Sequence, residues 1–179
     1  EESQPRSKLD GDSAARYGSN LLPVDERRPG LASPILSYPY DRTRAALEQL
    51  AKHGDPHPSH GWKLRYAHPA TGGHAFPTMA CFMQWLPQGF AGRPSRSTDG
   101  AVYCVVEGSG SVRIGEEAFQ FAPHDVFVVP SWQKYHFKAT DDCAIFSYSD
   151  RAAQEALVER DALVVGMEAP GADLGNGQP

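Results

Sequence analysis

Short apolar runs separated by turn residues occupy the middle of the chain. Glycine- and proline-containing turns divide this part into eight runs, at residues 62–68, 78–86, 101–108, 111–115, 117–121, 125–130, 135–139 and 143–149. Many short β-type runs at even spacing are typical of a sandwich or a small barrel of the jelly-roll type. The pattern therefore predicts an all-β fold. We expect two alternating apolar sets to face its core, namely Val102, Cys104 and Val106, and Val126 with Val128.

Two segments carry helix signals instead. Residues 41–54 begin with Asp41 as an N-cap, continue with helix-forming residues through Lys52 and end at Gly54. The apolar stripe of this predicted helix is modest and consists of Ala45, Ala46 and Leu50. A second helix is predicted over residues 150–161, directly after the last strand, where it would close the barrel.

The segment before the first helix has no periodicity. Residues 16–40 contain four prolines, and proline disfavours both helices and central strands. This segment therefore cannot bury its own aliphatic side chains. They are Leu21, Leu22, Leu31, Ile35 and Leu36. We expect an extended arm that packs on a surface outside its own barrel, either a second subunit or another domain.

The two ends of the chain complete the predicted organisation. Both are polar or rich in glycine and proline, which predicts that they lack regular structure. The predicted parts are a disordered N-terminus at 1–15, an arm and helix at 16–56, a barrel with its closing helix at 57–160 and a flexible tail at 161–179.

Composition narrows the classes of function. The chain has 179 residues, 40% of them hydrophobic, which suits one globular domain with additions. A net charge of −5 without any Lys/Arg run argues against nucleic acid or an anionic membrane as a partner. No apolar stretch is long enough to span a membrane and the polar start does not resemble a signal peptide. The three cysteines, Cys81, Cys104 and Cys143, are expected to be buried free thiols, so we expect a cytoplasmic protein.

One glycine-framed stretch resembles the first motif of the cupin barrels. Gly89 is followed by five residues, Ser-x-Ser, three residues, Ala101, six residues and Gly108. Cupins have His-x-His and Glu in this frame, and a later strand supplies a further His. Residues two apart on a strand point to the same face, so these ligands converge on a metal inside the barrel. Here the four ligand positions hold Ser95, Ser97, Ala101 and Tyr135. Hydroxyls and a methyl group bind divalent transition metals poorly, so no metal is expected.

Histidines elsewhere are weak alternatives as metal ligands. His136 lies one residue past the fourth ligand position, and such a shift turns a strand side chain to the opposite face unless a bulge intervenes. His57 and His60 are three residues apart, but nearby prolines favour a solvated loop. His68 and His74 flank one turn, where they could meet the first pair at a barrel rim.

The inward-facing polar residues form one candidate substrate-binding pocket in the barrel. They are Gln84, Ser95, Ser97, Tyr103 and Tyr135. A few convergent polar groups in a concave site are typical of ligand binding. Because no cationic or metal centre is expected among them, a satisfied hydrogen-bond network is the favoured interpretation, and no residue is predicted to be catalytic.

Longer stretches resemble the gentisate 1,2-dioxygenases and their salicylate- and 1-hydroxy-2-naphthoate-cleaving relatives. The resemblance covers residues 16–157 and includes RYGSNLLPV, KLRYAHPATGG, FPTMACFMQWLPQGF, SRSTDGAVYCVVEGSGSVRIG and DVFVVPSW. It implies iron-dependent oxidoreductases of aromatic compound degradation, in which two cupins form one longer chain. The first cupin holds iron(II) on three histidines and opens a hydroxylated benzoate ring with O₂. This chain resembles the second cupin, which implies that its iron lies in another domain and that the chain alone is inactive.

The resemblance also bears on individual residues and on assembly. Gln84 matches an inward glutamine of the iron-bearing cupin. Tyr103 takes the place of an arginine that faces the substrate there, so the resemblance implies that the anion-binding residue is missing. Family members form homo-oligomers, usually homotetramers. The sequence does not separate gentisate from salicylate or hydroxynaphthoate as the substrate.

Two interpretations follow. In the first, the chain is the metal-free second cupin of such an enzyme, with a structural and oligomerising role, and its partner is the N-terminal iron-bearing cupin or an equivalent subunit. In the second, it is a stand-alone cupin that binds a small aromatic acid or a protein partner without catalysis. A coding region directly upstream that carries His-x-His would separate the two.

Overall fold

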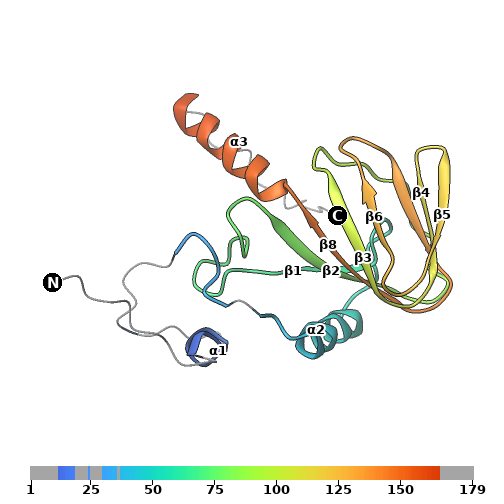
Figure 1. The fold of residues 1–179 in the computed structure, drawn as a ribbon, viewed down its shortest axis with the longest axis horizontal. Coiled ribbons are helices and arrows are strands. Elements are labelled where there is room, and N and C mark those ends of the chain that lie inside the picture. The colour runs from blue at the N-terminus through green and yellow to red at the C-terminus, as the bar shows by residue number, and fades with distance from the viewer. Residues whose placement is uncertain (1–11, 19–23, 25–29, 36, 166–179) are drawn as a thin grey trace, which may run out of the picture.

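Two antiparallel sheets enclose one core in this computed structural model, which describes residues 12–18, 24, 30–35 and 37–165 (Figure 1). The larger sheet has the strand order β1-β2-β8-β3-β6 and the smaller one β5-β4-β7. The strands are β1 Trp62–Arg65, β2 Ala80–Leu86, β3 Ala101–Glu107, β4 Gly110–Ile114, β5 Glu117–Phe121, β6 Val126–Val129, β7 Tyr135–Ala139 and β8 Cys143–Ser149. All eight predicted strands are confirmed, and with them the all-β architecture.

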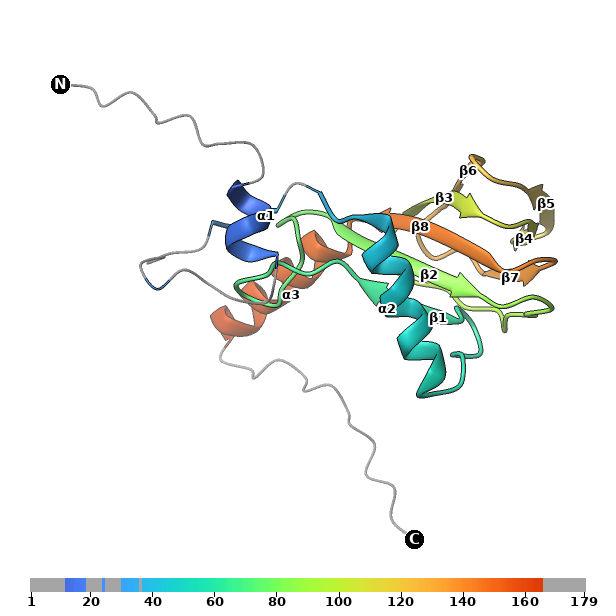
Figure 2. The same cartoon turned by 90° about the horizontal axis from the view of Figure 1, so that it is seen from below.

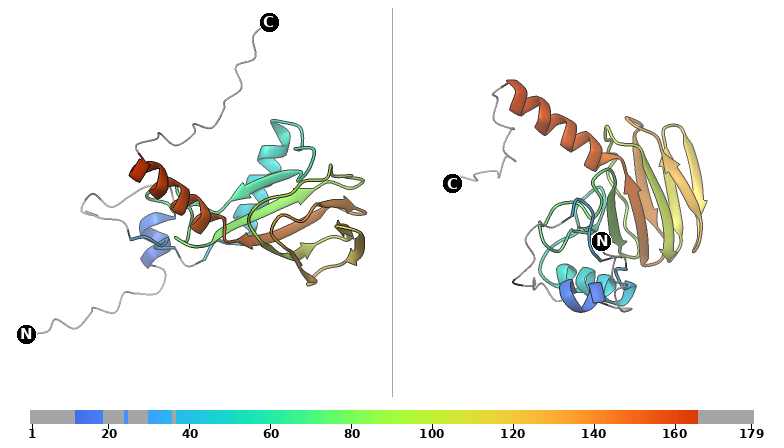
Figure 3. Two further views of the ribbon diagram at one scale, coloured as in Figure 1. Left: turned by 90° about the horizontal axis from the view of Figure 1, so that it is seen from above. Right: turned by 60° about the vertical axis from the view of Figure 1, so that its left-hand side comes forward.

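In the described part of the chain, three helices accompany the sheets: α1 Asp12–Tyr17, α2 Tyr40–Lys52 and α3 Arg151–Val165. Figure 2 shows α2 against the outer face of the larger sheet, where it contacts β1 and β2. In Figure 3, α3 continues from β8 and projects away from the two sheets. None of the helices in the described ranges is long and apolar enough to cross a membrane.

Helix α2 confirms the first predicted helix but buries a different face. Its N-cap is Pro39 and no side chain caps it, so Asp41 lies in the first turn instead of at the cap. The buried side chain is Leu47, whereas the predicted stripe is exposed. Arg44, one turn before Leu47, lies 4.3 Å above the Trp85 ring of β2. The face that docks on the sheet is therefore centred on Leu47 and Arg44.

The N-terminal segment differs from the predicted arm. Helix α1 includes residues that were expected to be disordered or extended, and Tyr17 at its end is buried. Farther on, the Ser33 N–H donates to the Ala75 carbonyl (2.7 Å) and the Tyr38 hydroxyl to the Ala67 carbonyl (2.8 Å). This part of the arm thus lies on the chain's own loop between β1 and β2, whereas the prediction placed the arm on a second subunit or another domain. Outside the described residues lie Leu21, Leu22 and Leu36, together with residues 1–11 and 166–179. Helix α3 reaches Val165, past the predicted boundary at 160.

The core uses the opposite face of β3 and β6 from the one predicted. Tyr103 and Val105 are buried in β3, as is Val129 in β6, while the expected core residues of β3 are only half-buried on the outer face. Val126 is 63% exposed and Val128 56% exposed. Residues 101–106 are all apolar, so their periodicity does not indicate which face is inside, and an error of one position exchanges the faces.

Gly108 connects β3 to β4 where a side chain would not fit. Its φ is +79°, and a Cβ there would meet the carbonyl oxygen of Asp142. We expect Gly108→Ala to lower the free energy of unfolding by about 2 kcal/mol, measured by urea denaturation. Gly89→Ala is the matched control, because φ is +77° there but nothing lies within 4 Å of the added Cβ. The control should cost about 1 kcal/mol, and equal losses would contradict a role for the Asp142 contact.

Candidate functional site

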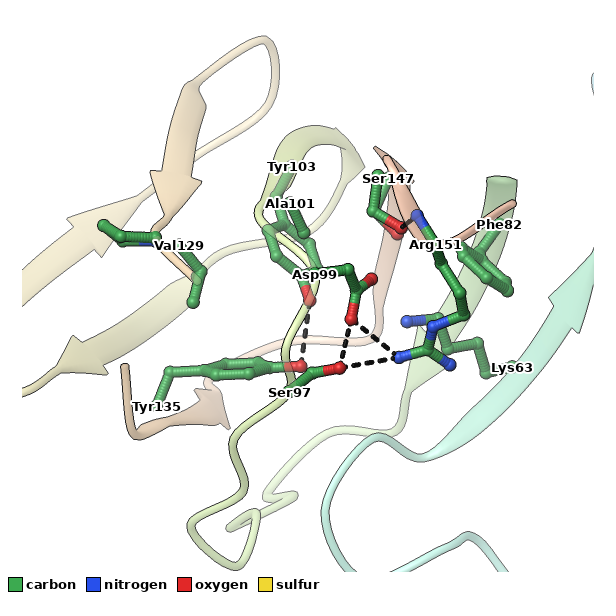
Figure 4. A pocket seen from close by; sticks show the side chains of 12 residues that line it. Lys63, Phe82, Ser97, Asp99, Ala101, Tyr103, Val129, Tyr135, Ser147 and Arg151 are labelled. Carbon is green, nitrogen blue, oxygen red and sulfur yellow. Dashed lines mark hydrogen bonds and ion pairs between the residues drawn. The ribbon is translucent and has the colours of Figure 1, made fainter. Parts of the chain in front are cut away.

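A small cavity lies between the two sheets, next to the first residue of α3. Its walls come from β1, β2, β3, β6, β7 and β8, the loop before β3, and Arg151. The cavity measures about 20 Å³, which is room for one or two groups of the size of a water molecule. Figure 4 shows the side chains of Asp99, Ser97 and Lys63 gathered around the guanidinium group of Arg151.

The structure brings three of the five predicted pocket residues together at this cavity. Ser97, Tyr103 and Tyr135 line it, and so does Ala101. Ser95 is not in the lining but pairs with Tyr135, whose carbonyl it meets at 3.0 Å through its N–H. Gln84 is buried in β2 outside the lining, and its amide oxygen and nitrogen have no hydrogen-bond partner among the described residues.

An ion pair between Asp99 and Arg151 borders the cavity. Arg151 Nη2 donates to Asp99 Oδ1 at 3.0 Å and to Ser97 Oγ at 3.0 Å, and Ser97 Oγ donates to Asp99 as well (Figure 4). Asp99 is only 7% exposed. Burial raises the pKa of Asp99, but hydrogen bonds from Arg151, Ser149 and Ser97 outweigh it and lower this pKa to about 2. The carboxylate is therefore charged at neutral pH and engaged by Arg151.

Lys63 brings a second cation to the same cavity. Its Nζ lies 4.6 Å from the centre of the Phe82 ring and 5.9 Å from that of Tyr103. Desolvation, followed by repulsion from Arg151, lowers the pKa of Lys63 to about 8, against a smaller opposing effect of Asp99. The amine points toward the Asp99–Arg151 pair in Figure 4. The described lining thus carries two cations and one carboxylate.

The prediction that the pocket has no cationic centre is wrong. The cations come from β1 and α3, outside the motif frames. The site therefore carries positive charge even though Tyr103 takes the place of the arginine that the resemblance implies. Alternation in β1 places Lys63 and Arg65 on the strand face opposite to Trp62 and Leu64. It does not indicate that this polar face lines a cavity. Arg151 lies 52 residues from its partner along the chain, and no local pattern predicts such a contact.

Two tyrosines form the wall between the cavity and the aromatic core. The Tyr103 hydroxyl donates to the Tyr135 hydroxyl at 3.0 Å. Burial, followed by the neighbouring Tyr135, raises the pKa of Tyr103 well above its ordinary value. Tyr103 therefore remains a neutral donor, and the proton of Tyr135 is free to point elsewhere.

The donor set does not fit a divalent metal such as iron(II). The cupin ligand positions carry hydroxyls and a methyl group, and the adjacent ammonium and guanidinium groups repel a metal cation. His136 lies on the face of β7 opposite to Tyr135 and Phe137, as strand alternation predicts. Within the described part of the chain no group of three or more His, Cys, Asp or Glu side chains could hold a metal ion.

The remaining candidate histidines lie in separate places. The rings of His57 and His60 stack with their centres 3.9 Å apart. Burial, then the proximity of His57 and Lys63, lowers the pKa of His60 to about 4, so His60 is neutral at pH 7. His68 contacts a backbone carbonyl of the N-terminal segment, and His74 contacts a carboxylate of α3. The rim cluster considered from the sequence is not formed.

Comparison with known proteins identifies relatives of this chain. Gentisate 1,2 dioxygenase 1 of Aquipseudomonas alcaligenes is 47% identical over 157 residues, which are 88% of this chain and 45% of that protein. The chain belongs to the gentisate 1,2-dioxygenase family. A 1-hydroxy-2-naphthoate 1,2-dioxygenase from a Nocardioides species is 35% identical over 142 residues, 76% of this chain and 36% of the relative. No protein-family model matches the chain.

The structural relatives of this gentisate dioxygenase homologue are of the same kind as its sequence relatives. The crystal structure of salicylate 1,2-dioxygenase from Pseudaminobacter salicylatoxidans superposes with a TM-score of 0.76 at 31% identity, over 82% of this chain and 44% of that one. This likeness confirms the predicted cupin fold. The chain spans less than half the length of these relatives.

Proposed function

We propose that this chain is the second, metal-free cupin of a gentisate 1,2-dioxygenase-like enzyme, which opens hydroxylated benzoate rings with O₂ on iron(II) held in another cupin. The observation that carries this proposal is the cavity lined by three of the four cupin ligand positions, which hold no metal ligand. The charged groups beside them are Lys63, Arg151 and Asp99. The role of the chain is then structural and oligomerising. The share of its relatives that it spans supports a partner domain that carries the iron.

An apolar row on the outer face of the larger sheet is the surface that we assign to this partner. Val128 of the edge strand β6, Val102 of β3 and Tyr148 of β8 lie opposite one another in register. Val126 and Tyr148 are also exposed on this face. Continuous exposed apolar surface is typical of an interface. We assign it to the iron-bearing cupin or to a neighbouring subunit of a homo-oligomer, a homotetramer by resemblance.

The alternative role as a stand-alone binder of a small aromatic acid gains no support from the barrel. Pockets for such ligands usually measure at least about 300 Å³, whereas the barrel cavity measures about 20 Å³. A cytoplasmic location is the remaining part of the proposal. Its support is that all three cysteines are free thiols.

The test is to express the chain alone and together with the iron-bearing first cupin. Alone with ferrous iron, the chain should consume no O₂ with gentisate. Together, the two should purify as one complex that does. Val126→Glu with Val128→Glu should lower the yield of complex about tenfold or more. Phe119→Glu is the control, because Phe119 is 45% exposed on β5 of the other sheet.

Three results would contradict the proposal. The first is ring cleavage by the chain alone. The second is one tightly held metal per chain in elemental analysis. The third is equal loss of the complex with the Phe119 variant, which would place the partner surface elsewhere.

A further inference from the structure

We propose that the barrel cavity is a binding site for a small monovalent carboxylate, no larger than formate, held by Lys63, Tyr135 and Ser147. The ammonium group of Lys63 and the bound anion would then occupy the place that other cupins give to a metal and its ligands. The proposal rests on the geometry of this cavity and not on the proposed enzyme, because it needs neither a partner domain nor ring cleavage.

The charges around the cavity leave one cation without a counter-ion. Asp99 is engaged by Arg151, by Ser97 and by Ser149. Among the described residues no Asp or Glu carboxylate forms an ion pair with Lys63. Asp99 favours the charged amine but only partly offsets the lowering of its pKa, and the contacts of the ammonium are with the rings of Phe82 and Tyr103. With a pKa of about 8, the Lys63 amine is mostly protonated at pH 7. One negative charge would balance the set.

The uncharged groups around the cavity supply further donors. Tyr135 accepts its hydrogen bond from Tyr103 and keeps its own proton for another acceptor. Ser147 lines the cavity, is 2% exposed, and its hydroxyl has no hydrogen-bond partner among the described residues. An unpaired buried hydroxyl costs about 1–3 kcal/mol, so a ligand that accepts from it is favoured. An ammonium and two hydroxyl donors match a carboxylate and do not match a cation.

The volume of the cavity sets the upper size of the ligand. About 20 Å³ accommodates one water or a carboxylate group, but not a carboxylate that carries an aromatic ring. Arg151 lines the cavity, and its side chain is 43% exposed. A small anion can therefore enter past Arg151 while the tyrosine wall remains in place.

The experiment measures the melting temperature of the full chain against sodium formate, with sodium gluconate keeping the ionic strength constant. A ligand that binds only the folded state raises the melting temperature in a saturable way, from which a dissociation constant follows. We expect saturation with the wild-type chain and at least about tenfold weaker binding for Lys63→Met. Lys138→Met is the matched control, since Lys138 is exposed on β7, and it should bind formate as the wild type does.

A second variant separates loss of the site from loss of the fold. Tyr135→Phe keeps the ammonium and removes one donor, so formate binding should weaken about 3- to 10-fold. A formate response that does not saturate, or that survives in Lys63→Met, would overturn the proposal. Benzoate that displaces formate would overturn the size limit. A chain that binds formate but forms no complex with an iron-bearing cupin would contradict only the proposed function.

Discussion

Replacing Phe137 by alanine is expected to lower the free energy of unfolding by about 3–5 kcal/mol. Phe137 on β7 is completely buried. Its ring lies 5.4 Å from that of Tyr103 and 5.7 Å from that of Tyr135, in edge-on arrangements that stabilise aromatic pairs. It also contacts the rings of Phe121 and Phe127, so it joins the smaller sheet to the larger one. Urea denaturation measures the loss.

Phe119→Ala is the matched control for this prediction. Phe119 lies on β5 of the same small sheet but is 45% exposed, so removal of its ring should cost less than about 1 kcal/mol. Similar losses for the two variants would mean that the aromatic cluster does not form the core of the barrel.

The strands were predictable because their signals are local. Turn residues such as Gly108 and Gly115 lie at the ends of the strands, and both have positive φ values, which glycine adopts without strain. The inward face of β3 was not predictable, since residues 101–106 are apolar on both faces. One face meets the barrel core, and we propose that a partner covers the other. From the sequence of one chain alone, apolar residues that face the core do not differ from apolar residues that a partner would cover.

The candidate site was predictable only in part, for a related reason. The motif frame placed Tyr135 at the cavity because alternation along a strand determines the direction of a side chain. It also placed Ser97 there, although Ser97 lies in the loop before β3 and Ser95 does not line the cavity. It could not place Lys63 or Arg151, since neither lies within a motif. Their charges come together through the pairing of β1 with β2 and through the start of α3. The uncharged motif positions suggested an empty barrel, whereas the barrel contains a charged site without metal ligands.

Asp99→Asn is expected to lower the free energy of unfolding by about 3 kcal/mol. This is the lower end of the range for removing one partner of a buried ion pair, because the other partner, Arg151, is partly exposed. The variant keeps the size of the side chain but leaves Arg151 and Lys63 as two cations without a carboxylate. The pKa of Asp99 in the folded chain, about 2, is below its ordinary value of 3.8. Its contribution to stability is therefore fully present above about pH 4 and is lost as the pH falls through 2. The stability difference between wild type and variant should shrink over that interval, and a constant difference would contradict this origin.

Removing Lys63 from the Asp99→Asn variant should restore part of the lost stability. The wild-type cavity carries a net charge of one, the single variant carries two, and Asp99→Asn with Lys63→Met carries one again. Because Lys63 lies in a desolvated place beside Arg151, we expect the double variant to recover about 1–2 kcal/mol in urea denaturation at pH 7. Lys138→Met in the same Asp99→Asn background lowers the total charge equally but acts on an exposed lysine, so it should recover almost nothing. Equal recovery by both lysine variants would show that total charge, and not the charge inside the cavity, determines the stability of the barrel.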